Sequence, residues 1–367
     1  MVTDSGPDDA ILSRLDSYFD AEGLAAVWFA RPNGFAWLTG GDSVVDRTAD
    51  RGVAAAGYDR ERVTVLTDSI EADRLAEEEL PPSVAVESFP WHETTLETHL
   101  AAGSPRPAAA DVAIEGFGSV DTTRLRQPLT EGDVERYRSL GETVAEAVEA
   151  VCRDCAPDDT EGAVAADLRG RLAAAGVETP VALVGGQRRA RRYRHYTPTD
   201  ESLGGYALVS VTASRGGLYA SCTRTVAFDP LAWLGERHLA AARVEASALA
   251  ATRRVGHEGG TAADVFEAIQ AAYAGVGHDG EWREHHQGGA AGYAGREWIA
   301  TPDSEEAVRL PMAYAWNPTV QGAKSEDTVL VTGEGFEVLT GTGDWPTVEV
   351  TGVGEDVTLE RPAVLER

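Results

Sequence analysis

The sequence is poor in basic residues and in lysine above all. Among 367 residues, 32 are Lys or Arg against 60 Asp or Glu, which gives a formal net charge of −28. Lys324 is the only lysine. A field of this sign repels phosphates, so the composition argues against nucleic acid as a partner.

Cysteines and long apolar runs are also scarce. Three cysteines are too few for a disulfide framework, and Cys152 and Cys155 lie in a helix-like segment where we expect a structural role. No run approaches the roughly 18 apolar residues of a membrane span. The N-terminus is acidic where a secretory signal would be basic. We therefore expect a soluble cytoplasmic protein with no membrane partner.

The length and patterning predict two domains, at about 150 residues per domain. Strand-like and helix-like segments alternate over roughly residues 1–122, which is typical of an α/β domain. Within it, 23–40 is expected to form a strand, a Pro-Asn-Gly turn and a second short strand. A proline followed by a helix start at Thr130 indicates a junction. The expected domains are 1–125 and 126–367.

The second half contains the order helix, helix, strands twice. A tight hairpin is expected around Gly216 and Gly217, where glycine suits the turn. The doubling indicates an internal structural repeat within an α/β (α+β) architecture, although no matching sequence repeat is visible. The remaining predicted segments are helices at 131–155, 161–176, 231–255 and 261–275, and strands near 311–317 and 326–340.

An arginine-rich run between residues 188 and 194 is the one candidate basic patch. Two interpretations stay open: a basic loop flanking a site, or a contact for an anion, since the arginine fork suits carboxylates. The run consists of Arg188, Arg189, Arg191, Arg192 and Arg194.

Four segments in order carry a resemblance to a known family. They are HYTPTDESL, ALVSVTASRGGLYASCTRTVAF, HHQGGAAGYAGRE and AYAWNPTVQGAKSEDTVLVTGEGFEVLT. Over residues 130–345 the chain resembles the pita-bread family of methionine aminopeptidase, prolidase (Xaa-Pro dipeptidase), aminopeptidase P and creatinase. The first domain, residues 1–125, resembles the creatinase/prolidase-type N-terminal domain, to which residues 23–40 are similar, and residues 126–367 are expected to form the pita-bread domain. The carboxylate-rich, lysine-poor composition resembles proteins of halophilic archaea, and we interpret it as adaptation to salt.

The resemblance implies five metal-ligand positions, most of which have changed. In the peptidases, two Asp, one His and two Glu bridge two divalent ions, because two close cations need several anionic oxygens. Here only Glu326 keeps a family ligand. His285 or His286 could act as a displaced ligand, but adjacent residues generally face different ways. One histidine together with Glu326 leaves too few donors for the site. We therefore predict no metal and no cofactor. The degenerate positions are Ser210, Ser221, Gly289 and Asn317.

Other polar residues of the same segments are retained. His195 and His285 match the family's substrate-side histidines, and a histidine near a carboxylate can exchange protons close to neutral pH without a metal. By analogy with creatinase we expect His195, His285 and Glu326 to be catalytic. The expected substrate-binding residues are His286, Arg224, Arg296 and Glu297.

Three functions stay open. The first is a metal-independent hydrolase or lyase acting on a small amide, amidino or peptide-like substrate by histidine and carboxylate chemistry. The second is a non-catalytic pita-bread binding or scaffold protein. The third is an Xaa-Pro metallopeptidase whose ligands lie elsewhere. In each case the expected partner is a small molecule or short peptide, and the resemblance implies a homodimer.

Overall fold

The chain divides into two compact units between Gly132 and Asp133. The computed structural model describes residues 6–229 and 231–367. Among these residues, no helix combines the length and apolar character that a membrane span requires. The three cysteines are buried and free, in agreement with the absence of a disulfide framework.

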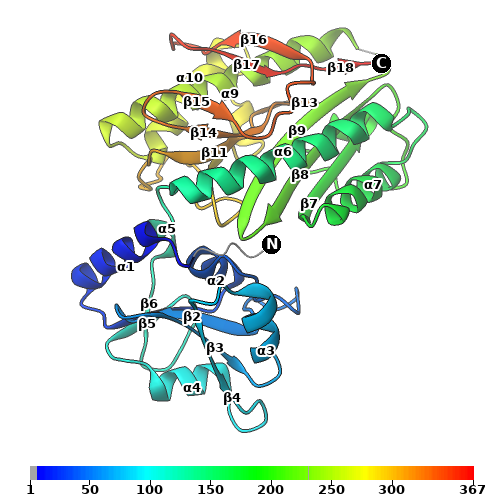
Figure 1. Ribbon diagram of the computed structural model, residues 1–367. Helices are drawn as coiled ribbons and strands as arrows, with labels where there is room; N and C mark the ends of the chain where they lie inside the picture. Colours follow the sequence, from blue (N-terminus) through cyan, green and yellow to red (C-terminus); the bar gives the residue numbers. More distant parts are fainter. Residues whose placement is uncertain (1–5, 230) are drawn as a thin grey trace. The chain divides into compact units, whose positions relative to one another are not determined.

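The first unit is a six-stranded sheet with helices (Figure 1). The strand order is β4-β3-β2-β1-β5-β6, with β2 antiparallel to both of its neighbours and the other pairs parallel. The elements are α1 (Asp9–Glu22), β1 (Ala26–Phe29), α2 (Pro32–Thr39), β2 (Ala54–Tyr58), β3 (Val63–Asp68), α3 (Ala72–Arg74), the π-helix η1 (Leu75–Glu79), β4 (Ala85–Phe89), α4 (Leu96–Gly103), β5 (Ala108–Ala110), β6 (Gly118–Ser119) and α5 (Thr122–Leu125).

The expected second strand of residues 23–40 is wrong, because this segment forms helix α2. Pro32 takes an initial position of the helix, where its missing N–H is not needed. Gly40 ends the helix in the left-handed region, at φ 76°. The residues from Gly34 to Thr39 are all buried. A segment that is apolar on every side has no periodicity by which its sequence distinguishes a helix from a strand.

The second unit repeats the order helix, helix, strands, as the sequence predicts, and α6 and α7 lie along the first of its two four-stranded sheets (Figure 1). The first half comprises α6 (Glu131–Asp154), α7 (Glu161–Ala174), β7 (Glu178–Gly186), α8 (Gln187–Ala190), β8 (Tyr206–Arg215) and β9 (Leu218–Ala227). The second half comprises α9 (Ala232–Glu258), α10 (Ala262–Gly275), the 3-10 helix η2 (Glu281–Arg283), β10 (Gly288–Ala291), β11 (Met312–Trp316), β12 (Thr319–Val320), β13 (Ala323–Lys324), β14 (Asp327–Val331) and β15 (Phe336–Val338).

The sheets of the two halves meet where the candidate site lies. Strand order is β18-β9-β8-β7 in one sheet and β10-β11-β14-β15 in the other. The Thr223 amide on β9 donates to the Glu326 carbonyl before β14, at 3.0 Å, so the two halves are hydrogen-bonded there. The β8–β9 hairpin turns at Gly216 and Gly217, both with positive φ, as expected. The last strands are β16 (Thr347–Thr351), β17 (Thr358–Pro362) and β18 (Leu365–Glu366).

Candidate functional site

Three histidines from two loops form a cluster. His195 lies between α8 and β8, while His285 and His286 lie between η2 and β10. One nitrogen from each of the three rings lies within 4.8 Å of the others. The expectation that the adjacent His285 and His286 face different ways is wrong, since their rings stack with centroids 4.3 Å apart. The structure thus brings together all three histidines that the sequence singled out.

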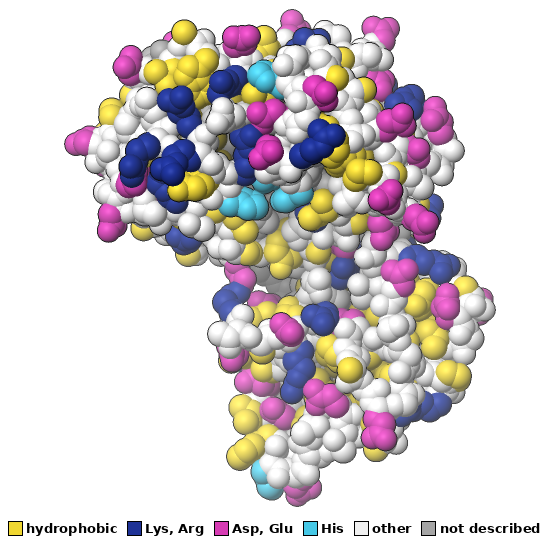
Figure 2. Space-filling model, turned by 180° about the vertical axis from the view of Figure 1, so that it is seen from behind, with side chains coloured by type: hydrophobic (Ala, Val, Ile, Leu, Met, Phe, Trp, Pro, Cys, Tyr) yellow, Lys and Arg dark blue, Asp and Glu magenta, His cyan; other side chains and the backbone are white. Residues whose placement is uncertain are grey.

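The three rings differ in exposure. His285 is buried, while His195 and His286 are exposed. Figure 2 shows histidine side chains on one face of this unit, with cationic and acidic side chains beside them. A small molecule can therefore reach the cluster from the side of His195 and His286.

The surroundings of all three histidines lower their pKa values and so favour the neutral form at pH 7. Burial, followed by the charge of Lys324, lowers the pKa of His285 to about 2. Although the His286 side chain is exposed, partial loss of hydration among its protein neighbours, followed by the charge of Arg296, lowers its pKa to about 4. The pKa of the exposed His195 is also lowered, by partial loss of hydration and then by Lys324, while Glu326 acts in the opposite direction. Neutral imidazole has one N–H and one lone pair, so the hydrogen bonds fix where each proton lies.

The His286 carbonyl determines which ring nitrogen carries the proton in His285 and in His195, because a carbonyl oxygen can only accept a hydrogen bond. His285 Nδ1 forms a short hydrogen bond with that carbonyl oxygen and must be its donor. His285 Nε2 therefore carries the lone pair, and His195 Nε2 donates a hydrogen bond to it across 3.1 Å. The lone pair of His195 is consequently on Nδ1. This chain of hydrogen bonds orients His195 as a proton acceptor, the arrangement that a general base requires.

Glu326 is a fixed anion in this site. Its carboxylate accepts from the Thr223 hydroxyl at 2.8 Å and contacts Arg296 and Lys324, each at 2.9 Å. Burial is the largest influence on its pKa and raises it, but Lys324, Arg296 and Thr223 together hold the pKa at about 2. Glu326 therefore keeps its charge at neutral pH and does not carry protons itself.

Ser210 and Ser221, which the sequence resemblance assigns to the two Asp ligand positions, use their hydroxyls within the fold. Ser210 Oγ lies 2.9 Å from the Tyr196 hydroxyl and 2.8 Å from the Thr223 hydroxyl. Ser221 Oγ lies 2.9 Å from the Thr212 hydroxyl and accepts from Arg296 at 3.2 Å. Neutral hydroxyls in such a network do not offset the charge of a metal pair.

The Gly289 and Asn317 positions offer no charge either. A Cβ on Gly289 would lie 2.1 Å from the Trp298 carbonyl oxygen, so the backbone leaves no room for a side chain. Asn317 is buried just after β11, and its Oδ1 has no hydrogen-bond partner among the described residues. Its neutral amide is the only side-chain donor that these two positions provide. The five positions therefore do not fit two bridged divalent ions.

Arg224 lies apart from the histidines. Successive strand residues face opposite sides of a sheet, so Arg224 points away from the face of Thr223. Its guanidinium donates to Asp327 at 2.9 Å and lies 3.5 Å from Glu149. Asp327 also pairs with Arg361 at 2.6 Å. These contacts form a buried ionic network on the other side of the sheet, away from the histidine cluster.

Arg296 contacts Glu326 and Ser221 of the site, whereas the hydrogen bond of Glu297 is to a backbone amide. Arg296 Nη1 donates to the Gly295 carbonyl at 2.6 Å, in addition to its contacts with Ser221 and Glu326. Glu297 accepts from the Tyr293 amide at 2.8 Å. The predicted site residues did not include Lys324, which contacts Glu326 at 2.9 Å; the signal that could have found it is that it is the only lysine.

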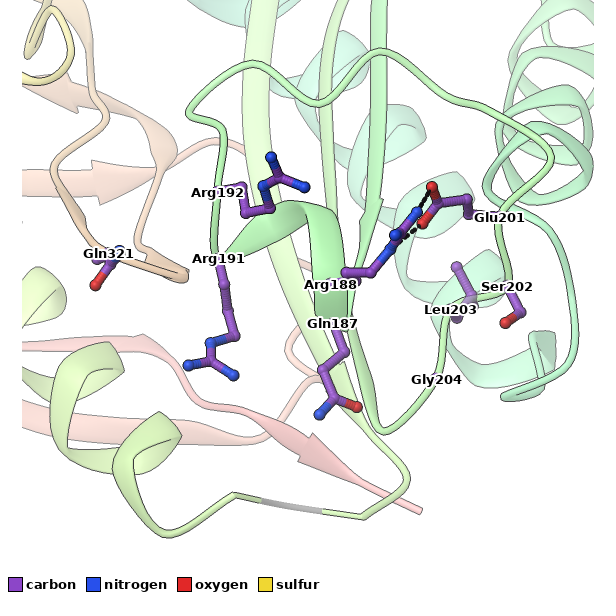
Figure 3. A pocket seen from close by; sticks show the side chains of 9 residues that line it. All are labelled: Gln187, Arg188, Arg191, Arg192, Glu201, Ser202, Leu203, Gly204 and Gln321. Carbon is purple, nitrogen blue, oxygen red and sulfur yellow. Dashed lines mark hydrogen bonds and ion pairs between the residues drawn. The ribbon is translucent and has the colours of Figure 1, made fainter.

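The arginine-rich run borders a separate hollow of about 680 Å³ (Figure 3). Arg188 pairs with Glu201, Arg189 with Glu161 and Arg194 with Glu281. Figure 3 shows that the Arg191 and Arg192 side chains point away from each other. The paired arginines tie the loop that carries His195 to its neighbours, and the two others do not converge on one point.

Comparison with known proteins agrees with this architecture. The model of metallopeptidase family M24 matches residues 135–333. The chain therefore belongs to this family, and the pita-bread fold expected from the sequence is confirmed. None of the curated proteins matches the sequence.

Several solved structures share the fold over nearly their whole length. The prolidase from Pyrococcus horikoshii OT3 is 19% identical with a TM-score of 0.74, covering 91% of this chain and 99% of its own. The dipeptidase PepE from Mycobacterium ulcerans is 22% identical with a TM-score of 0.71, covering 95% and 100%. The N-terminal domain of the FACT complex subunit SPT16 from Cicer arietinum (chickpea) is 11% identical with a TM-score of 0.63, covering 94% and 98%.

Proposed function

We propose that this chain hydrolyses a small amide, amidino or peptide-like substrate by histidine acid/base chemistry, without the two-metal site of the peptidases. The observation that carries the proposal is the hydrogen-bond chain from the His286 carbonyl through His285 to His195. It leaves a proton-accepting nitrogen on an exposed, neutral histidine. The solved structures that are prolidases and dipeptidases support an amide-type substrate.

The reaction for an amide follows from this arrangement. His195 Nδ1 takes a proton from a water molecule while the water oxygen bonds to the substrate carbonyl carbon. The resulting imidazolium returns the proton to the departing nitrogen as the C–N bond breaks, which yields an acid and an amine. His285 is the positioning residue that holds His195, and the fixed charge of Glu326 favours the imidazolium that forms in between.

A screen of small amides and peptides in high salt tests this function. The assay includes a chelator and compares wild type with His195→Gln and with His92→Gln, which changes an exposed histidine of the first unit. We expect turnover in chelator that falls about 100-fold or more in H195Q, the usual size of an acid/base contribution, and is unchanged in H92Q. Equal turnover in wild type and H195Q would contradict the proposal.

Metal content gives a second, independent test. The histidine triad is the one group of three or more potential ligands in residues 6–229 and 231–367 that converges closely enough to hold an ion. We expect chelator-free preparations to contain well under one equivalent of transition metal per chain. Two ions per chain would establish the metallopeptidase alternative. One ion that is lost in both His195→Gln and His285→Gln would show that these histidines are metal ligands. It would overturn His195 as the base and His285 as the residue that positions it.

A non-catalytic binding protein is the second candidate. It is favoured by the saturation of Glu326, whose two oxygens are already occupied by Lys324, Arg296 and Thr223. It is also supported by the same fold in a domain of SPT16, a subunit of a complex. Binding of a screened ligand with no turnover in wild type distinguishes this candidate, and analytical ultracentrifugation tests the homodimer that we propose from the family.

A further inference from the structure

We infer that the cluster of His195, His285 and His286 binds one added transition-metal ion of the zinc class, and that the bound ion blocks the hydrolysis proposed above. The site shares no residue with the five metal-ligand positions expected from the family. Binding of the ion stands on the cluster alone, whereas the inhibition rests on the proposed function.

The first observation is the spacing of the ring nitrogens. His195 Nε2 lies 3.1 Å from His285 Nε2, and one nitrogen from each of the three rings lies within 4.8 Å of the others. Zinc binds imidazole nitrogen at about 2.0–2.1 Å. At the 3.1 Å separation, an ion at that distance from both nitrogens makes an angle of about 100° with them, which is close to tetrahedral.

His286 completes the set from the solvent side. Its ring is stacked on His285 with planes only 28° apart, so its lone pair lies in a nearly parallel plane and the ring has to turn to meet a shared ion. The His286 side chain is exposed, which leaves it free to change rotamer. Three imidazoles leave the fourth tetrahedral position to water.

The second observation is that both histidine loops are anchored. Tyr196 and Gln287, which directly follow the histidines of the two loops, are buried. An ion pair between Arg194 and Glu281 joins the first loop to the short helix η2, which precedes the second loop. The ligands are thus held near one another before an ion binds, and this reduces the entropic cost of binding.

The third observation is the chemistry of the donors, since the described cluster consists of imidazoles alone. Imidazole suits Zn²⁺, Ni²⁺ and Cu²⁺, whereas Mg²⁺ and Mn²⁺ favour carboxylate oxygens. The Glu326 carboxylate is engaged with Lys324 and Arg296. These two cations oppose positive charge on the rings. The ion is therefore held weakly enough to be lost in purification, in agreement with the low metal content expected above.

The bound ion removes the proton acceptor of the proposed reaction. Without the ion, His195 carries its proton on Nε2 and its lone pair on Nδ1. An ion at Nε2 takes the place of that proton, which leaves to water, while Nδ1 takes up a proton and keeps the ring neutral. Nδ1 then no longer accepts a proton from the attacking water, so the ion inhibits.

Equilibrium dialysis of chelator-treated, desalted protein against ZnCl₂, MgCl₂ or MnCl₂ in high KCl tests the site. We expect one Zn²⁺ per chain, with Mg²⁺ and Mn²⁺ bound at least about 100-fold more weakly. Manganese bound as tightly as zinc would overturn the inference, because it would indicate a carboxylate site instead.

Variants locate the ion. His195→Gln and His285→Gln should each weaken zinc binding by about 100-fold, and His286→Gln by about 10-fold, because each removes one ligand. His92→Gln, at an exposed position of the first unit, is the matched control and should bind zinc as wild type does. Equal zinc binding by wild type and a folded H285Q protein would overturn the inference.

Histidine labelling covers the case in which H285Q fails to fold. Diethyl pyrocarbonate acylates exposed neutral histidines, and mass spectrometry reports each one separately. Zinc should protect His195 and His286 and leave His92 as reactive as before. Labelling of His195 and His286 at the same rate with and without zinc would contradict the inference.

Initial rates separate this inference from the proposed function. Inhibition of wild-type turnover by zinc, reversed by chelator, supports both. Zinc binding by a chain that shows no turnover in chelator overturns only the proposed function. Turnover that continues unchanged while zinc saturates the site overturns only the inhibition.

Discussion

The Lys324 ammonium lies 2.9 Å from a carboxylate oxygen of Glu326. Arg296 occupies the other oxygen at the same distance. The buried Glu326 carboxylate is thus held between two side-chain cations. In the function that we propose, these internal ion pairs take the place of a metal pair.

The pH dependence of activity should follow His195. Its pKa is lowered from 6.5 by burial and Lys324, with Glu326 acting against them and the neutral His285 and His286 facing the ring. A general base works in its neutral form, so kcat/KM should rise with pH along a limb whose midpoint is below 6.5 and be level above it. Removing the positive charge in Lys324→Met should move this limb to higher pH.

The measurement is a pH series of initial rates for wild type and K324M at constant ionic strength. A midpoint above 7 in wild type, or a shift to lower pH in K324M, would show that another group controls the reaction.

Stability in acid should depend on Glu326. Its pKa is depressed in the folded chain from 4.5 to about 2, so the stabilisation is present above about pH 4.5 and is lost as the pH falls toward 2. A difference of this size corresponds to about 3 kcal/mol. Urea unfolding between pH 5 and 2 should show a weaker pH dependence in Glu326→Gln than in wild type. Glu305→Gln, at an exposed position, is the control and should keep the wild-type slope.

Gly289→Ala should destabilise the fold by about 1–3 kcal/mol, because the new methyl group would meet the Trp298 carbonyl at 2.1 Å. The control is Gly170→Ala, an exposed position in α7 with open space around it, where alanine should stabilise the helix by up to about 1 kcal/mol. Thermal unfolding of the two variants measures both effects. If G289A unfolds at the wild-type temperature, the close approach of Trp298 is refuted.

Arg224→Met should destabilise the fold by about 1–3 kcal/mol, because it removes the cation between the buried carboxylates of Asp327 and Glu149, which keep only Arg361 and Arg153 as partners. Arg169→Met, which removes an exposed charge, should change stability by less than about 0.5 kcal/mol. Chemical denaturation of both variants provides the comparison. A stable R224M protein with altered ligand binding would instead return Arg224 to the binding site.

Much of the fold could be read from the sequence, because strongly periodic segments and turn residues act locally. The long helices α6, α9 and α10 and the hairpin at Gly216 and Gly217 lie where apolar spacing and glycine predicted them. Helix α2 was missed, since a segment buried on all sides carries no periodic signal.

The sequence by itself determined the family and the presence of a single lysine, and it predicts the loss of four ligand positions, since each depends only on which residue occupies a position. Only the tertiary structure decided which of the candidate site residues contact one another. It stacked the adjacent His285 and His286 beside His195, turned Arg224 to the far side of its strand and placed Lys324 on Glu326. Such contacts depend on loop paths and on the alternation of side chains along paired strands, which residues distant in sequence do not encode locally.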